Sequence, residues 1–139
     1  MIDYHYLTDF QIDNEAEYSD WIDRIIISEN ATQGQLDFIF CDDEYLLKIN
    51  QDYLQHDTFT DIITFPYGDD QNIAGDIFIS VERVRENAKT FKVEFESELR
   101  RVMSHGILHM LGFGDKNDQE IQLMREKENE KLKLFHVEH

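Results

Sequence analysis

Residues 61–80, with the sequence DIITFPYGDDQNIAGDIFIS, contain two apolar runs separated by residues that favour turns. The runs at 61–65 and 73–80 are rich in Ile and Phe, which favours β-strands, whereas Pro, Gly, Asp and Asn fill the space between them. We expect two strands that pair as neighbours. Ser80, at the end of the second run, is a typical N-cap, so the chain should enter a helix there.

The pattern on either side predicts the remaining elements. Apolar and polar residues alternate over 2–7, and β-branched and aromatic residues fill 35–41, which predicts two further strands. Apolar residues at helical spacing predict helices at about 14–30, 42–49, 81–91, 94–111 and 118–134, with a polar loop at 51–60. We therefore expect one α+β domain over residues 1–139, in which a small mixed sheet of about four strands packs with about five helices.

The composition is that of a folded protein without disulfides or membrane spans. Hydrophobic residues make up 41% of the 139 residues, which is enough for a core. Cys41 is the single cysteine, so the sequence excludes an intramolecular disulfide and an all-cysteine zinc site, and we expect a buried thiol on a strand. The sequence contains no leader-like segment and no apolar run of about 20 residues, so we expect a cytoplasmic protein that does not enter membranes.

The charge is distributed unevenly along the chain. Residues 1–80 hold 18 Asp and Glu but 2 Lys and Arg, whereas residues 81–139 hold 12 acidic and 11 basic side chains. A net charge of −17 argues against non-specific binding of nucleic acid, because phosphates need several cationic contacts. The acidic first 80 residues favour a basic protein partner instead.

The segment from His105 to Asp115 concentrates side chains that bind metals. His105 and His109 are four residues apart on a predicted helix, so their rings lie on one face and can converge on one ion, as on the metal helix of the zincins. Gly112 can end this helix in a left-handed conformation, and Gly114 can bend the chain again. That path would return Asp115 to the two histidines as a third ligand.

A metal with three protein ligands keeps one open position, which is typical of catalytic zinc. Zinc lowers the pKa of bound water to about 7, so we expect hydrolytic chemistry with one zinc ion per chain. The zinc peptidases place Glu directly after the first histidine, and Gly106 at that position disfavours a peptidase. The alternative is a pair of surface or core histidines without a metal. Glu98 and Arg101, earlier on the same face, are either polar partners of the site or part of a solvated surface.

A basic stripe precedes the histidine helix. Arg85, Lys89 and Arg101 are the candidate substrate-binding residues, because they belong to the main cationic grouping that could meet phosphates. Glu82 and Glu86 alternate with these cations, so ordinary ion pairs along a helix are the alternative interpretation.

Several motifs resemble those of the YbeY family of bacterial endoribonucleases. Residues 105–112, HGILHMLG, closely match the family signature His-Gly-x-Leu-His-x-Leu-Gly-x-Asp-His. Residues 50–53 and 57–66 resemble its Asn-x-x-Tyr motif and its Thr-Asp-Val-Leu-Ser-Phe-Pro stretch, and residues 75–80 resemble its Gly-Asp-Ile-x-Ile-Ser strand. These motifs occur in the family's order.

The resemblance implies a compact α+β fold, zinc held by His105 and His109, and metal-assisted cleavage of phosphodiester bonds in single-stranded RNA. It also implies a role in the processing of small-subunit ribosomal RNA, in ribosome maturation and in ribosome quality control. Two positions depart from the family pattern. Asp115 stands where the family has its third histidine ligand, and Leu54 stands where the family usually has Arg after the tyrosine.

Three functions remain open from the sequence. The first is a zinc-dependent endoribonuclease whose ribosomal RNA substrate is presented by a protein partner on the ribosome. The second is a non-catalytic assembly factor that docks on basic ribosomal proteins through its acidic first 80 residues. The third is a metal-dependent hydrolase of another substrate.

Overall fold

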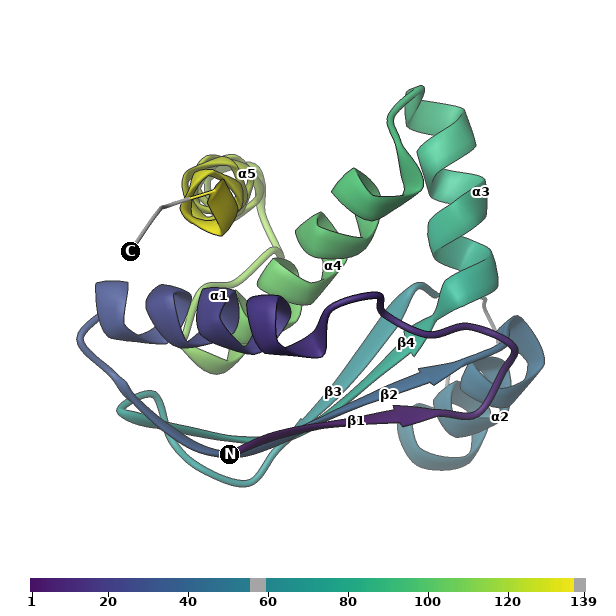
Figure 1. Ribbon diagram of the computed structural model, residues 1–139, viewed down its shortest axis with the longest axis horizontal. Coiled ribbons are helices and arrows are strands. Elements are labelled where there is room, and N and C mark those ends of the chain that lie inside the picture. Colours follow the sequence, from purple (N-terminus) through teal and green to yellow (C-terminus); the bar gives the residue numbers. More distant parts are fainter. Residues whose placement is uncertain (56–59, 137–139) are drawn as a thin grey trace.

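The computed structural model describes residues 1–55 and 60–136 (Figure 1). The strands are β1 (Ile2–Tyr6), β2 (Thr32–Cys41), β3 (Ile62–Pro66) and β4 (Asn72–Ser80). The helices are α1 (Glu15–Ser28), α2 (Asp43–Leu54), α3 (Val81–Phe91), α4 (Phe95–Met110) and α5 (Asp118–Lys133), followed by a short 3₁₀ helix, η1 (Leu134–His136). Within residues 1–55 and 60–136, no helix is both long and apolar enough to cross a membrane.

The four strands form one mixed sheet in the order β1-β2-β4-β3. Strands β1, β2 and β4 are parallel, and β3 pairs antiparallel with β4, with Ile63 opposite Phe78. The predicted α+β domain with a small mixed sheet and five helices is therefore confirmed. The predicted pairing of the two strands in residues 61–80 is confirmed as well, and Ser80 accepts a hydrogen bond from the Arg83 amide as the N-cap of α3.

The two faces of the sheet carry separate apolar clusters. Figure 1 shows α1, α3, α4 and α5 on one side of the sheet, where the larger core includes Trp21, Phe38 and Ile77. On the other face, Leu46 of α2 packs in a smaller cluster with Cys41, so the predicted buried strand thiol is confirmed. Successive side chains of a strand point to opposite faces, which is why both faces need apolar cover.

Three hydrogen bonds that involve Lys131 hold α5 against α1 and its C-terminal end. The Trp21 indole donates a hydrogen bond of 2.7 Å to the carbonyl of Lys131. The ammonium of Lys131, which is fully buried, donates to Glu29 at 2.6 Å and to Ser28 at 2.9 Å. A buried ammonium is stable only when it is paired, so these contacts specify where the C-terminal end of α5 lies.

Several element boundaries differ from the sequence-based expectation. Helix α2 continues to Leu54, so the predicted loop at 51–60 was wrong for its first residues. The helix stops because Gln55 adopts the left-handed conformation, with φ 56°, a role for which Gly is the usual signal. Strand β2 begins at Thr32, before the predicted 35, because a pairing irregularity lets its polar start continue along β4. Residues 56–59 of the predicted loop lie outside the described residues.

The ion pair of Glu29 predicts a pH-dependent contribution to stability. Burial raises the pKa of Glu29, but hydrogen bonds from Lys131 and Lys127 lower it more, so its pKa lies below the ordinary value. A depressed pKa gives stability that is present above the unfolded-state pKa and is lost as the pH falls through the folded-state pKa. We expect Glu29→Gln to lower the free energy of unfolding by about 2 kcal/mol near neutral pH, because Lys131 loses its anion.

Urea unfolding of wild type and variant at neutral pH and at successively lower pH measures this effect, and the difference should shrink as the pH falls through the depressed folded-state pKa of Glu29. Glu130→Gln is the matched control, because that side chain is 55% exposed and lies 3.6 Å from Lys131. It should cost less than about 0.5 kcal/mol. Equal losses in the two variants would rule out the proposed role of Glu29.

Candidate metal centre

The histidines of α4 face a hollow between the helix and the sheet. His105 and His109 lie one helical turn apart, with ring centroids separated by 4.4 Å, and both are partly buried. The hollow has a volume of about 410 Å³. Its described lining residues come from α2, from the start of β3, from α4 and from the loop after it: Asn50, Leu54, Thr60, Asp61, Ile62, Ile63, Thr64, His105, His109 and Asp115.

Asp115 returns to the two histidines, as the sequence predicts. Its Oδ2 atom lies 3.2 Å from Nε2 of His109 and 3.5 Å from Nε2 of His105. The three ligand atoms lie within 4.8 Å of one another, and this is the one such group of three or more His, Cys, Asp or Glu in the described part of the chain. The spacing suits a single metal ion between them.

Two glycines give the loop after α4 its path. Gly112 has φ 105°, and its amide donates to the carbonyl of His109, so the chain turns sharply at the end of the helix. At Gly114 a Cβ atom would meet the carboxylate of Glu120 at 2.8 Å, so a larger side chain would displace that group. The Glu120 carboxylate in turn accepts the amide of Lys116 at 3.0 Å, which fixes the chain on the far side of Asp115.

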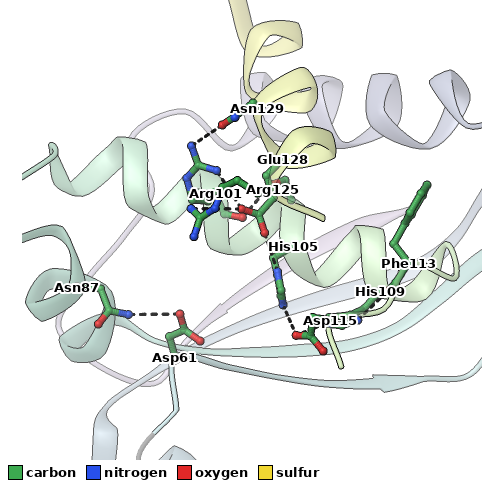
Figure 2. Close-up of polar contacts among 11 residues, drawn as sticks. Asp61, Asn87, Arg101, His105, His109, Phe113, Asp115, Arg125, Glu128 and Asn129 are labelled. Carbon is green, nitrogen blue, oxygen red and sulfur yellow. Dashed lines mark hydrogen bonds and ion pairs between the residues drawn. The ribbon is translucent and has the colours of Figure 1, made fainter. Parts of the chain in front are cut away.

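Hydrogen bonds on the δ nitrogens orient both rings (Figure 2). Nδ1 of His105 lies 2.7 Å from Oε2 of Glu128, and Nδ1 of His109 lies 2.9 Å from the carbonyl oxygen of Phe113. A carbonyl oxygen only accepts, so Nδ1 of His109 carries the proton, and the same arrangement suits His105 beside a carboxylate. The lone pairs of both Nε2 atoms are thereby directed toward Asp115. The two rings are suited to bind a metal ion through Nε2, because ligating histidines usually donate the N–H of their other ring nitrogen in a hydrogen bond of this kind.

Glu128 links the metal centre to α5. The buried carboxylate accepts from Nη1 of Arg101 at 2.9 Å as well as from His105, and Nη2 of Arg101 donates to Asn129 at 2.8 Å. Burial raises the pKa of Glu128, but the hydrogen bonds from His105 and Arg101 lower it more, so the net shift is downward. Burial lowers the pKa of His105, whereas the hydrogen bond to Glu128 raises it more, so the net shift is upward.

Two of the three candidate substrate-binding cations lie apart from the histidines, and the third is already paired with a carboxylate. Arg85 lies over the ring of Phe95, 5.4 Å from its centroid, and Lys89 lies 3.7 Å from Glu86 on the same helix. Neither lines the hollow at the histidines. Arg101 is next to the site, but its contacts go to Glu128, which matches the alternative of a polar partner.

Sequence reasoning missed two carboxyl groups beside the site. Glu128 lies on the apolar stripe of α5 with the buried Met124 and Lys131, so an acid at a core position was the available signal. Asp61 lines the hollow, and burial is the main reason that its pKa lies above the ordinary value. Asn87 donates a long hydrogen bond of 3.4 Å to Asp61.

Gly106 allows α4 to approach β3 closely. A Cβ atom there would meet the Cδ1 atom of Ile62 at 2.8 Å and the Cγ2 atom of Thr64 at 3.4 Å. The position next to the first histidine therefore faces the sheet, and a larger side chain there would have to displace the end of the Ile62 side chain. The packing agrees with the argument against a peptidase.

We expect Glu128→Gln to weaken zinc binding by about 10–100-fold, because it removes the anion that orients His105. Competition with a chelating dye gives the affinity of each variant. Glu126→Gln makes the same change on an exposed position of α5 and should bind zinc like the wild type. Wild-type affinity in Glu128→Gln would show that the hydrogen bond does not support a metal site.

The chain is similar to known proteins over nearly its whole length. The family model described as Endoribonuclease YbeY matches residues 5–136. Proteins named Endoribonuclease YbeY from Flavobacterium johnsoniae and Flavobacterium psychrophilum are 56% and 58% identical to the chain, over 99% of its length and 99% and 98% of theirs. The solution structure of TM1509 from Thermotoga maritima has a TM-score of 0.67 and 27% identity, and covers 97% of this chain and 89% of its own. The resemblance seen in the motifs is confirmed, and the chain belongs to the YbeY endoribonuclease family.

Proposed function

We propose that this protein is a zinc-dependent endoribonuclease that cleaves single-stranded RNA during small-subunit ribosomal RNA processing, ribosome maturation and ribosome quality control. The observation that carries the proposal is the convergence of two oriented Nε2 atoms and the Asp115 carboxylate in a hollow beside the sheet. The relatives' name supplies the reaction class, cleavage within RNA. The cytoplasm, where ribosomes mature, is the proposed location.

The donor set fits one zinc ion per chain, held by His105, His109 and Asp115. Zinc supplies Lewis acidity toward a phosphate oxygen and lowers the pKa of a water molecule, which is the chemistry that phosphodiester hydrolysis needs. Glu128 and the carbonyl of Phe113 hold the two rings in the required orientation. The Asp61 carboxyl is the titratable group on the opposite wall, in a position to exchange a proton with a bound substrate.

The charge of the hollow makes RNA binding depend on the metal. Among its described lining residues there is no Lys or Arg, and Leu54 from α2 contributes an apolar surface. A phosphate in this hollow would face Asp61 and Asp115, so the ion would be its main positive neighbour. We infer that the protein binds RNA weakly without metal and relies on a partner at the ribosome to present the substrate.

The same observation favours a second candidate function. A hollow without its own cation also suits an assembly factor that binds zinc but does not cleave RNA, and that docks on basic ribosomal proteins. The two candidates differ in whether metal-loaded protein cuts RNA.

Cleavage of a labelled single-stranded RNA by metal-loaded protein tests the nuclease. We expect His109→Ala to lower the cleavage rate by at least about 100-fold, because the ion contributes several kcal/mol of transition-state stabilisation. Asp115→Asn should lose less, since it removes charge but keeps an oxygen ligand. Gln122→Ala, on an exposed position of α5, is the control for protein handling.

Equal cleavage by wild type and His109→Ala would end the nuclease proposal. Zinc binding without any cleavage, together with salt-sensitive capture of basic ribosomal proteins, would favour the assembly factor.

A further inference from the structure

A second hollow, of about 260 Å³, adjoins the metal centre, and we call it the side pocket. It lies between α3, the first half of α4 and α5, and residues from all three helices line it: Asn87, Phe91, Glu98, Arg101 and Arg125. Asp61, Ile62 and His105 line both this pocket and the hollow at the histidines. The two hollows are therefore continuous.

Glu98 is a buried carboxyl group at the side pocket that lacks a partner. The residue is 5% exposed, and within residues 1–55 and 60–136 its side chain forms no hydrogen bond and no ion pair. Burial, and then the neighbouring Asp61, raise the pKa of this carboxyl. A place in the first turn of α4 favours an acid, because a helix N-terminus attracts negative charge, but it does not explain burial without donors.

A buried polar group without a partner is costly, so it calls for a specific explanation. The oxygens of Glu98 are not sealed in the core, and the residue lines the side pocket. We infer that a ligand in the pocket supplies the missing donors.

The side pocket also offers hydrogen-bond donors and an aromatic ring. The side chain of Arg125 is 61% exposed, and its Nη1 atom lies 3.9 Å from Glu128, which is too long for a hydrogen bond. Phe91, the last residue of α3, is 59% exposed. Figure 2 shows Asp61 and Asn87 across from Arg125. Acceptors, donors and a ring thus surround one small space.

This mixture of groups selects a nucleobase as the occupant. A free phosphate would meet the carboxyl groups of Glu98 and Asp61, and a cationic side chain of a protein would meet the guanidinium groups of Arg101 and Arg125. A base is neutral, carries donors and acceptors on its edge, and stacks on aromatic rings through its flat face. The volume is slightly below the roughly 300–1,000 Å³ of small-molecule pockets, which suits a single base.

Guanine matches these polar groups better than the other bases do. Its N1–H and N2–H groups are adjacent donors, and a carboxylate accepts both of them. Such donors favour the ionised form of a buried carboxyl such as Glu98. The O6 and N7 atoms of guanine are the acceptors that arginine binds most often. Adenine, cytosine and uracil place an acceptor beside each donor, so each would set a lone pair against the carboxylate.

We propose that the side pocket binds a guanine base of a single-stranded RNA substrate. Glu98 accepts the N1–H and N2–H groups, Arg125 donates to the other edge, and the ring of Phe91 stacks on the base. The proposal rests on the proposed nuclease function, because the continuity of the two hollows places this guanine beside a phosphate at His105 and His109. Cleavage should therefore favour a bond next to guanine.

Titration of the protein, with one equivalent of zinc present, tests the pocket without any cleavage. The probes are the 5′-monophosphates of guanosine, adenosine, cytidine and uridine, and ¹H–¹⁵N spectra report their binding. We expect guanosine monophosphate to bind at least about fivefold more tightly than the other three and to shift the amides of α4 around Glu98 and Val102.

Glu98→Gln should reduce this preference to less than about twofold, because the amide group of Gln turns a donor toward the donors of guanine. Glu96→Gln makes the same change on an exposed position of the first turn of α4 and should keep the preference. Removal of an unpaired buried carboxyl should leave the melting temperature unchanged or higher, so a lost preference cannot be assigned to unfolding. Arg125→Gln, on an exposed side chain, should also weaken binding of guanosine monophosphate.

Equal affinity for the four nucleotides, or a preference that survives in Glu98→Gln, would overturn the proposal. A preference for another base would overturn the assignment to guanine. Cleavage of a labelled uridine heptamer with one central guanosine places the pocket relative to the reacting phosphate, and we expect cuts beside the guanosine. Selective binding of guanosine monophosphate by a protein that cuts no RNA refutes the nuclease alone, whereas cleavage without any base preference refutes the side pocket alone.

Discussion

The hydrogen bond between Glu128 and His105 is the contact on which the geometry of the candidate metal centre depends. Its two residues lie on α5 and α4, so the orientation of one candidate ligand is set by a helix that follows in the chain. Helix α5 is held in turn by the buried Lys131 and by the Trp21 indole of α1. The site is therefore connected to the first helix through the core, and loss of packing at α1 should disturb the orientation of the His105 ring.

The second histidine is positioned by local structure. His109 donates to the carbonyl of Phe113, four residues later, where the turn at Gly112 brings the chain back. The same turn delivers Asp115. One candidate ligand thus depends on the tertiary fold, while the other two depend on a helix end of a few residues. This division explains how a short motif can suggest a metal site whose stability still requires the whole domain.

The same division decides what could be predicted from the sequence. The spacing of His105 and His109, the turn at Gly112 and the return of Asp115 are local, and the structure brings these residues together as expected. Glu128 lies 23 residues from its partner, and no local pattern reports such a contact. The alignment of Asp3, Asp37 and Asp76 across β1, β2 and β4 could not be predicted either, because the register of these strands is a property of the folded sheet. Arg85 and Lys89 are the opposite case. They form a cationic stripe in the sequence, but in the structure they contact Phe95 and Glu86.

The central claim is that both imidazoles carry their proton on Nδ1 and offer Nε2 to a metal. Long-range ¹H–¹⁵N correlation spectra of the protein, recorded during zinc titration, report the state of each ring nitrogen directly. The account predicts that one equivalent of zinc shifts the Nε2 resonances of His105 and His109 while both Nδ1 atoms remain protonated. Resonances that do not respond to zinc, or coordination through Nδ1 with the loss of the Glu128 contact, would contradict it.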